Sequence, residues 1–245
     1  MDVNLNDVAL FVANSTGDQN DKTRRAITDV GQIFPNLTNL IQNKLNVQNI
    51  EDIYDDSSIS LRRLLIQHNS DKSSPHRYHI LYNVILKDRE NIKNVLEVGL
   101  GTNNPGIIST MGVGGSPGAS LRAFKEYLPN ANIYGLDIDK DILFEEERIK
   151  TYFVDQTDAR TFNQLDLPND FDLIIDDGLH SPNANLTTLL YGLTKVKIGG
   201  YVVIEDIARE ALPFWVVVSA LLPDTYEQRI YDDGLGLIYS VKNMK

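Results

Sequence analysis

Short apolar runs alternate with amphipathic segments from about residue 93 onward, and this alternation is the clearest pattern in the chain. Strand-like runs cover residues 95–98, 132–137, 149–154, 171–175 and 201–205. Segments with helical spacing of apolar residues lie between them, at 119–128, 139–147, 158–165 and 184–195. Strands that alternate with helices are joined by crossover connections, so the pattern predicts an α/β fold with a mostly parallel, Rossmann-like sheet.

The two ends of the chain differ from this pattern. Near the C-terminus, two strand-like runs at 225–231 and 235–241 flank an Asp-Asp-Gly turn, which predicts an antiparallel hairpin at one edge of the sheet. Residues 1–75 lack clear strand alternation, and apolar residues such as Val30, Ile33 and Leu61, Leu65 recur at helical spacing. We therefore expect a helical N-terminal extension or cap over 1–75 and the main domain over 76–245.

Composition narrows the class of protein. The chain has 245 residues, of which 42% are hydrophobic, and no run approaches the ~20 apolar residues of a membrane span. It has no cysteine and a formal net charge of −11, which disfavours a thiolate metal site and binding to a phosphate backbone. The first residues do not resemble a secretion signal, so we expect a cytoplasmic protein with no membrane or nucleic-acid partner.

A glycine turn follows the first strand of the main domain. Glu97, Gly99 and Gly101 end that strand, and Asp137 ends the next one. A turn without side chains lets a ligand approach the backbone, and a carboxylate at the next strand end suits a pair of ribose hydroxyls. The pattern indicates a nucleoside-containing cofactor at the carboxyl edge of the sheet.

Further motifs extend this pattern in a fixed order. They are Asn69-Ser-Asp71-Lys72 with His76 and Tyr78, Leu96–Gly101, Gly118-Ala-Ser120, Gly135-Leu-Asp137, Asp155-Gln156, Ile175-Asp176-Asp177-Gly-Leu-His180 and Ile204-Glu205-Asp206. Over residues 69–207 the chain resembles the class I S-adenosylmethionine-dependent methyltransferases, in particular the bacterial macrocin and mycinamicin sugar O-methyltransferases and the cephalosporin-pathway methyltransferase. The resemblance implies a seven-stranded sheet that ends in a reversed strand.

The resemblance also implies roles around the cofactor. Gly118 and Ser120 open a helix beside it, and Asp155 and Gln156 meet its adenine, although an acid here also suits a helix N-cap. Asp177 is a further candidate for contact with the cofactor. The segment 102–117 is longer than a turn needs, and it is interpreted either as a lid over the cofactor or as a simple loop.

Acidic residues end two successive strands: Asp176 with Asp177, and Glu205 with Asp206. Neighbouring parallel strands lie about 4.8 Å apart, so these carboxylates are expected to converge and to repel one another unless a cation separates them. Oxygen ligands without cysteine favour a hard ion, Mg²⁺ first. We expect Asp176, Glu205 and Asp206 to bind it; the alternative is that two of the acids are solvated or cap helices.

His180 lies three residues after Asp177, on the loop that leaves the same strand. Histidine exchanges a proton near neutrality, so His180 is the candidate general base and Asp176, through the cation, its partner in catalysis. The resulting hypothesis is metal-assisted O-methylation of a sugar or sugar-like small molecule. A nicotinamide-dependent oxidoreductase and a non-catalytic relative remain alternatives, and the apolar 207–224 segment suits either a substrate wall or the interface of a homo-oligomer.

Overall fold

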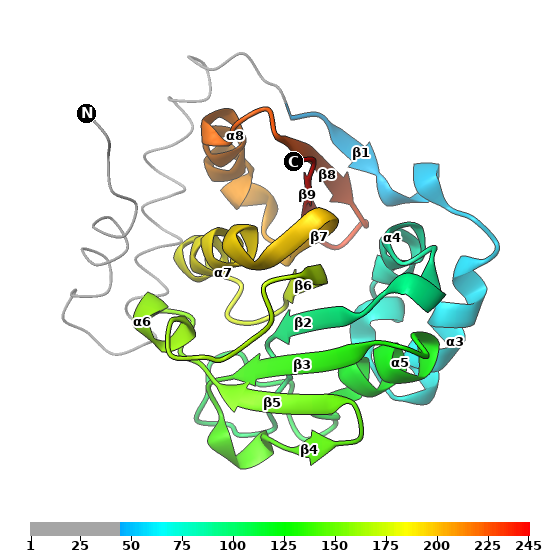
Figure 1. The fold of residues 1–245 in the computed structure, drawn as a ribbon, viewed down its shortest axis with the longest axis vertical. Helices are drawn as coiled ribbons and strands as arrows, with labels where there is room; N and C mark the ends of the chain where they lie inside the picture. The colour runs from blue at the N-terminus through cyan, green and yellow to red at the C-terminus, as the bar shows by residue number, and fades with distance from the viewer. Residues whose placement is uncertain (1–44) are drawn as a thin grey trace.

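A nine-stranded sheet forms the centre of the protein in a computed structural model that describes residues 45–245 (Figure 1). Its strand order is β1-β8-β9-β7-β6-β2-β3-β5-β4. The strands are β1 (Val47–Asn49), β2 (Asn94–Val98), β3 (Asn132–Asp137), β4 (Glu145–Glu146), β5 (Ile149–Phe153), β6 (Phe171–Asp176), β7 (Val196–Ile207), β8 (Tyr226–Asp232) and β9 (Leu237–Asn243). The α-helices of the described residues are α3 (Ser58–Gln67), α4 (Tyr78–Ile85), α5 (Ala119–Tyr127), α6 (Ala159–Phe162), α7 (Pro182–Lys195) and α8 (Leu212–Leu221).

The predicted α/β class is confirmed, but the prediction of seven strands is wrong. Two short edge strands complete the sheet: β1 pairs in parallel with β8, and β4 pairs antiparallel with β5. These strands are three and two residues long, too short to leave a period-two pattern in the sequence. The predicted hairpin is confirmed, since β8 and β9 pair antiparallel and β9 also runs antiparallel to β7.

Alternate residues of the central strands point to opposite faces of the sheet and form two hydrophobic cores. Val95, Leu173 and Val203 belong to the core that also contains side chains of α3, α4 and α5. Their neighbours in sequence, Leu96 and Ile174, belong to the other core, with side chains of α6, α7 and α8. The fold therefore has three layers, with helices on both faces of the sheet (Figure 1).

The helical extension predicted over 1–75 is described only in part. Val30 and Ile33 lie outside the described residues. Leu61 and Leu65 do lie on a helix, α3, where both are fully buried in the same core as the sheet. Residues 47–49 form β1, a strand where helix was expected. The boundary between extension and main domain at residue 75 stays a prediction.

One other segment differs from expectation. The helix predicted over 139–147 is absent: Asp139 accepts a hydrogen bond from the Asp141 backbone and begins a single 3-10 turn at 140–142, after which the chain enters β4. Within 207–224, residues 212–221 form α8, and Trp215 is fully buried in the core while Leu221 is exposed. Of the helices in residues 45–245, none combines the length and the apolar character needed to cross a bilayer.

Candidate active site

A cavity of about 340 Å³ lies at the carboxyl ends of β2, β3 and β6. This is the edge at which parallel α/β sheets bind ligands, because the loops that leave the strands part there. Of the residues predicted to bind a cofactor, those that line it are Glu97, Gly99, Gly101, Ser120, Asp137, Asp155, Gln156 and Asp177. His180 and Asp206 also line it.

The glycine turn after β2 forms one wall of this cavity. Gly99 and Gly101 have φ of +95° and +75°, in the left-handed region that favours glycine. A Cβ atom on Gly99 would lie 2.0 Å from the Asp177 carbonyl oxygen, so only glycine lets the β2 and β6 loops approach this closely. The Asp137 carboxylate accepts a hydrogen bond of 2.7 Å from the Leu100 backbone and so holds the turn against the end of β3.

The segment after Gly101 contributes to the same cavity. Ile107, Ile108 and Met111 line it, and the Met111 backbone donates to the Thr102 carbonyl over 2.8 Å, which closes the segment back on its start. Gly118, predicted to border the cofactor, begins α5 with φ of +72°, and a Cβ there would meet the Phe144 ring. Its role is to turn the chain into α5.

The residues predicted to meet adenine have different surroundings. Gln156 is tied into the protein: its amide donates to the Asp176 carboxylate and to Thr188, both over 2.8 Å, and accepts from the Leu179 backbone over 2.8 Å. Asp155 accepts from the Thr157 backbone over 2.9 Å. Helix α6 is capped by Asp158, whose side chain accepts from the Arg160 backbone. Asp155 thus faces the cavity with capacity to accept further bonds, whereas Gln156 braces the loop after β6.

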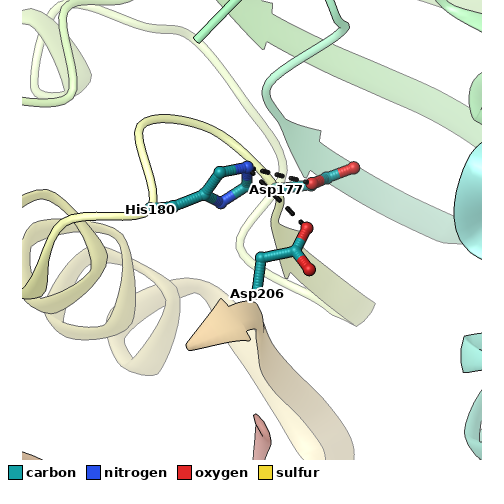
Figure 2. Close-up of side chains that lie close together, drawn as sticks. All are labelled: Asp177, His180 and Asp206. Atoms are coloured by element: carbon teal, nitrogen blue, oxygen red, sulfur yellow. Dashed lines mark ion pairs between the residues drawn. The ribbon is translucent and has the colours of Figure 1, made fainter. Parts of the chain in front are cut away.

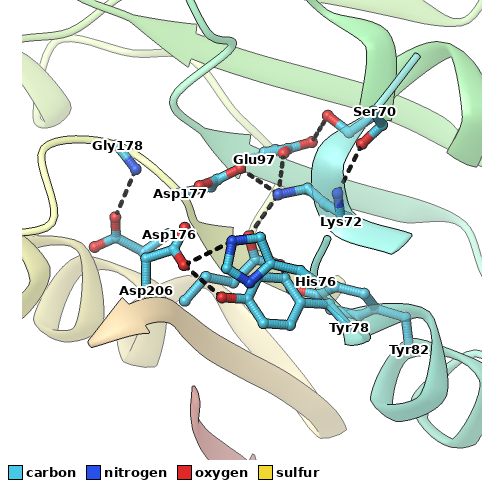
Figure 3. Close-up of polar contacts among 12 residues, drawn as sticks. Ser70, Lys72, His76, Tyr78, Tyr82, Glu97, Asp176, Asp177, Gly178 and Asp206 are labelled. Atoms are coloured by element: carbon cyan, nitrogen blue, oxygen red, sulfur yellow. Dashed lines mark hydrogen bonds and ion pairs between the residues drawn. The ribbon is translucent and has the colours of Figure 1, made fainter. Parts of the chain in front are cut away.

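A buried lysine in the cavity wall joins three acids. The Lys72 ammonium, 1% exposed, forms ion pairs with Glu97 (3.0 Å), Asp177 and Glu205. Burial alone would lower the pKa of this ammonium, but the three carboxylates raise it well above its usual range. A cation was expected among the converging acids, and for Glu97, Asp177 and Glu205 the side chain of Lys72 supplies that charge (Figure 3).

Glu97 and Glu205 are both engaged by protein partners. The second oxygen of Glu97 accepts from the Ser120 hydroxyl over 2.7 Å. Glu205 accepts from the Tyr82 hydroxyl as well as from Lys72. Two of the residues predicted to bind a metal, Asp176 and Glu205, are both fully buried, and Asp176 bonds Gln156 below the cavity. The structure does not bring either of them into the acidic group at the cavity mouth.

That group consists of Asp177, His180 and Asp206, whose ligand atoms all lie within 4.8 Å of one another (Figure 2). His180 Nε2 lies 3.8 Å from Asp177 Oδ1 and 3.7 Å from Asp206 Oδ2. His180 and Asp206 both have positive φ, 52° and 51°, which is uncommon for these residues and turns both side chains toward the same point. We name these three residues the mouth cluster.

The mouth cluster has the donor set of a hard-cation site. Burial, helped by the neighbouring Asp206, raises the pKa of Asp177 to about 6, although Lys72 opposes the effect. Two carboxylates that disfavour each other's charge, with a nitrogen donor beside them, fit a divalent cation. The turn at Gly99, Asp137 and the cavity volume fit a nucleoside cofactor in the same way.

The sequence missed part of this site. Lys72 belongs to one of the motifs that carry the resemblance, but its buried ion pairs with acids at three strand ends were not predicted. Asp233, in the turn between β8 and β9, carried no functional signal, yet its carboxylate bonds His76. Its only sequence clue is the Asp-Asp-Gly turn, which indicates a hairpin and says nothing of where the hairpin lies relative to the site.

No family model matches the chain. Among curated proteins it is 30% identical, over 156 residues, to the 8-demethyl-8-alpha-L-rhamnosyl tetracenomycin-C 2'-O-methyltransferase of Streptomyces olivaceus, covering 62% of the chain and 39% of that enzyme. It is 41% identical, over 103 residues, to the mycinamicin VI 2''-O-methyltransferase of Micromonospora griseorubida, covering 39% of the chain and 26% of that enzyme. The chain thus spans well under half the length of these relatives.

Among solved structures, the MycE methyltransferase of the mycinamycin biosynthetic pathway, in complex with Mg and SAH (S-adenosylhomocysteine), is similar with a TM-score of 0.62 and 25% identity. The match covers 75% of this chain and 54% of that one. A MycE complex that also contains mycinamycin VI shares the fold with a TM-score of 0.61 and covers 94% of this chain. By fold and by sequence, the chain is therefore similar to S-adenosylmethionine-dependent methyltransferases and, among them, to sugar O-methyltransferases.

Proposed function

We propose that the protein transfers a methyl group from S-adenosylmethionine to a hydroxyl of a sugar or sugar-like small molecule, with the help of a divalent cation. The observation that carries the proposal is the mouth cluster: an imidazole and two carboxylates within 4.8 Å of one another, on the rim of a cavity of about 340 Å³. The names of the relatives support the same reaction, because all of those cited are O-methyltransferases.

The cavity would bind the cofactor through backbone and carboxylate groups. The turn at Gly99 and Gly101 offers a backbone wall, Asp137 would accept from the ribose hydroxyls, and Asp155 would accept from the adenine amine. Ile107 and Met111 add apolar atoms to the lining of the same cavity. When bound, S-adenosylmethionine supplies a methyl group already activated on a sulfonium, so the protein's tasks are alignment and proton removal.

Asp177 and Asp206 would hold the cation. Each presents an oxygen to the mouth, and hard cations such as Mg²⁺ prefer oxygen ligands to imidazole nitrogen. A cation at this point supplies a Lewis acid that makes a nearby hydroxyl more acidic. Asp176 and Glu205 were predicted as ligands of the cation. We assign them supporting roles instead, because Gln156 and Lys72 engage them below the mouth.

His180 would accept the proton of the acceptor hydroxyl at Nε2. That atom faces Asp177 and Asp206 at 3.8 and 3.7 Å, so a proton arriving there meets negative charge. His180 Nδ1 has no hydrogen-bond partner within the described residues. The two carboxylates therefore orient the ring, in place of the usual bond to Nδ1.

Ligand binding and turnover test this proposal together. Calorimetry with S-adenosylhomocysteine and with nicotinamide nucleotides, each with and without Mg²⁺, should show binding of the former alone. Labelled methyl from S-adenosylmethionine should then pass to a member of a panel of glycosides, and a chelator should stop it. Nicotinamide binding would favour the oxidoreductase alternative, and cofactor binding without transfer to any glycoside would favour a non-catalytic relative.

A further inference from the structure

Asp233, in the turn between β8 and β9, is linked to the mouth cluster through His76. Its side chain is fully buried, and one carboxylate oxygen accepts from the backbones of Leu235 and Gly236, both over 2.8 Å. The other oxygen lies 2.8 Å from His76 Nδ1. Because a carboxylate only accepts hydrogen bonds, this contact places a proton on Nδ1 and fixes the ring's orientation.

The chain before α4 clamps the same turn from outside. Arg77 donates through Nε to the Asp233 carbonyl over 3.0 Å. The Asp233 backbone donates in turn to the Gly236 carbonyl over 3.2 Å, which closes the turn. The position of the Asp233 carboxylate is therefore set by main-chain and side-chain contacts that do not involve the cavity.

His76 connects Asp233 to Asp206. Its ring stacks on that of Tyr78, with centroids 4.5 Å apart and planes at 27°, and its Nε2 lies 3.5 Å from Asp206 Oδ1. The Tyr78 hydroxyl donates to the same oxygen. Figure 3 shows both rings on one side of the Asp206 carboxylate.

The two oxygens of Asp206 thus have different surroundings. Oδ1 is held by Tyr78 and lies beside His76, whereas Oδ2 faces His180. Asp206 has a left-handed backbone, an uncommon conformation whose side-chain direction must be maintained by neighbouring groups. In metal sites, partners of this kind orient a ligating carboxylate and typically contribute roughly 10- to 100-fold to metal affinity.

We infer that Asp233 and His76 are positioning residues for Asp206: they fix one oxygen of its carboxylate so that the other points into the mouth cluster, where it binds the cation. The inference rests on the proposed function, since it assigns the cation to Asp206. It adds a residue from the far end of the chain, Asp233, that contacts neither the cavity nor the cation.

Binding of Mn²⁺ to the whole protein tests the inference without turnover. Asp233→Asn keeps an oxygen that can accept the two backbone hydrogen bonds of the turn. It also puts an amide donor against His76 Nδ1, which favours a ring without a proton on that nitrogen. We expect Mn²⁺ affinity, measured by electron paramagnetic resonance, to fall at least about tenfold. S-adenosylhomocysteine affinity and the midpoint of urea unfolding should stay close to wild type.

The matched control is Asp232→Asn in the same turn. Asp232 carries the same charge but pairs with Arg209 at the surface, so its replacement should leave Mn²⁺ affinity unchanged. In a protein that already carries Asp206→Asn, the Asp233 substitution should have no further effect, because the two act through one carboxylate.

Equal Mn²⁺ affinity in wild type and Asp233→Asn would overturn the positioning role and leave the proposed function standing. If Asp233→Asn lowered Mn²⁺ affinity by the same factor in wild type and in a protein that carries Asp206→Asn, the positioning role would also be overturned. A wild-type protein that binds S-adenosylhomocysteine but not Mn²⁺ would contradict the proposed cation, and the role of Asp233 would fall with it.

Discussion

His180 Nε2 lies 3.7 Å from Asp206 Oδ2, although His180 follows β6, Asp206 lies near the end of β7, and the two are 26 positions apart in the chain. Both adopt a left-handed backbone. Such a conformation costs on the order of 1 kcal/mol for a residue with a side chain and persists where the surroundings enforce it. Two strained residues that aim at one point of a cavity rim are most simply explained by a shared chemical task.

Replacing His180 with alanine tests its part in that task. We expect turnover to fall at least ~100-fold, because the acceptor hydroxyl loses its proton acceptor. Affinity for S-adenosylhomocysteine should change little, since the cavity wall at Gly99 and Asp137 is untouched. The control is His68→Ala: His68 pairs with Glu126 on the surface and should tolerate the change. Full turnover in His180→Ala would remove this residue from the mechanism.

Lys72→Met tests the buried ion network. The substitution leaves Glu97, Asp177 and Glu205 without their shared cation in a buried site, so we expect the free energy of unfolding to drop by ~3–5 kcal/mol. Urea unfolding measures this directly. Lys150→Met, which breaks an exposed pair with Glu145 at 3.8 Å, should cost no more than about 0.5 kcal/mol. Equal effects of the two substitutions would mean that Lys72 does not neutralise the buried acids.

A comparison of Gly99→Ala with Gly199→Ala separates the cost of backbone strain from the cost of the close contact between the β2 and β6 loops. Gly99 and Gly199 both have positive φ, +95° and +82°, but a Cβ on Gly199 meets nothing within 4 Å. We expect Gly199→Ala to cost ~1 kcal/mol of unfolding free energy through strain alone. Gly99→Ala should cost several times more and weaken cofactor binding, because the new methyl group displaces the Asp177 backbone. Similar losses in both variants would contradict the close packing of the β2 and β6 loops.

Cation binding should depend on pH through Asp177. Burial raises the pKa of this carboxyl to about 6, and only the deprotonated form binds a cation. Protons therefore compete as the pH falls through about 6, and Mn²⁺ affinity should drop about tenfold between pH 7 and pH 5. S-adenosylhomocysteine binding, measured alongside by calorimetry, serves as the reference. A flat Mn²⁺ profile over this range would exclude Asp177 as a ligand with a raised pKa.

The sequence predicted the parts of the fold that are set by local patterns. The run 94–98 is buried at every position, as expected for the central strand of a parallel sheet, and the hairpin at the C-terminus followed from its Asp-Asp-Gly turn. Strand ends could therefore be placed, and with them the acids that follow the strands.

Side-chain partners across the fold could not be predicted in this way. Asp176 and Asp177 are adjacent in sequence, yet one bonds Gln156 beneath the cavity while the other faces its mouth, because successive residues point to opposite sides at a strand end. Lys72 meets Glu205 across 133 positions of sequence, and no local pattern encodes that contact. The charged segment 139–147 has helical spacing, but pairing of Glu146 with Ile149 of β5 replaces the helix.

Crystals of the protein grown with S-adenosylhomocysteine and Mn²⁺ would test the central claim most directly. The account predicts an anomalous Mn²⁺ peak between the carboxylates of Asp177 and Asp206, with the cofactor against the Gly99 turn and its sulfur toward His180. A cofactor bound in the cavity while the mouth cluster holds no Mn²⁺, or a sulfur directed away from His180, would contradict it.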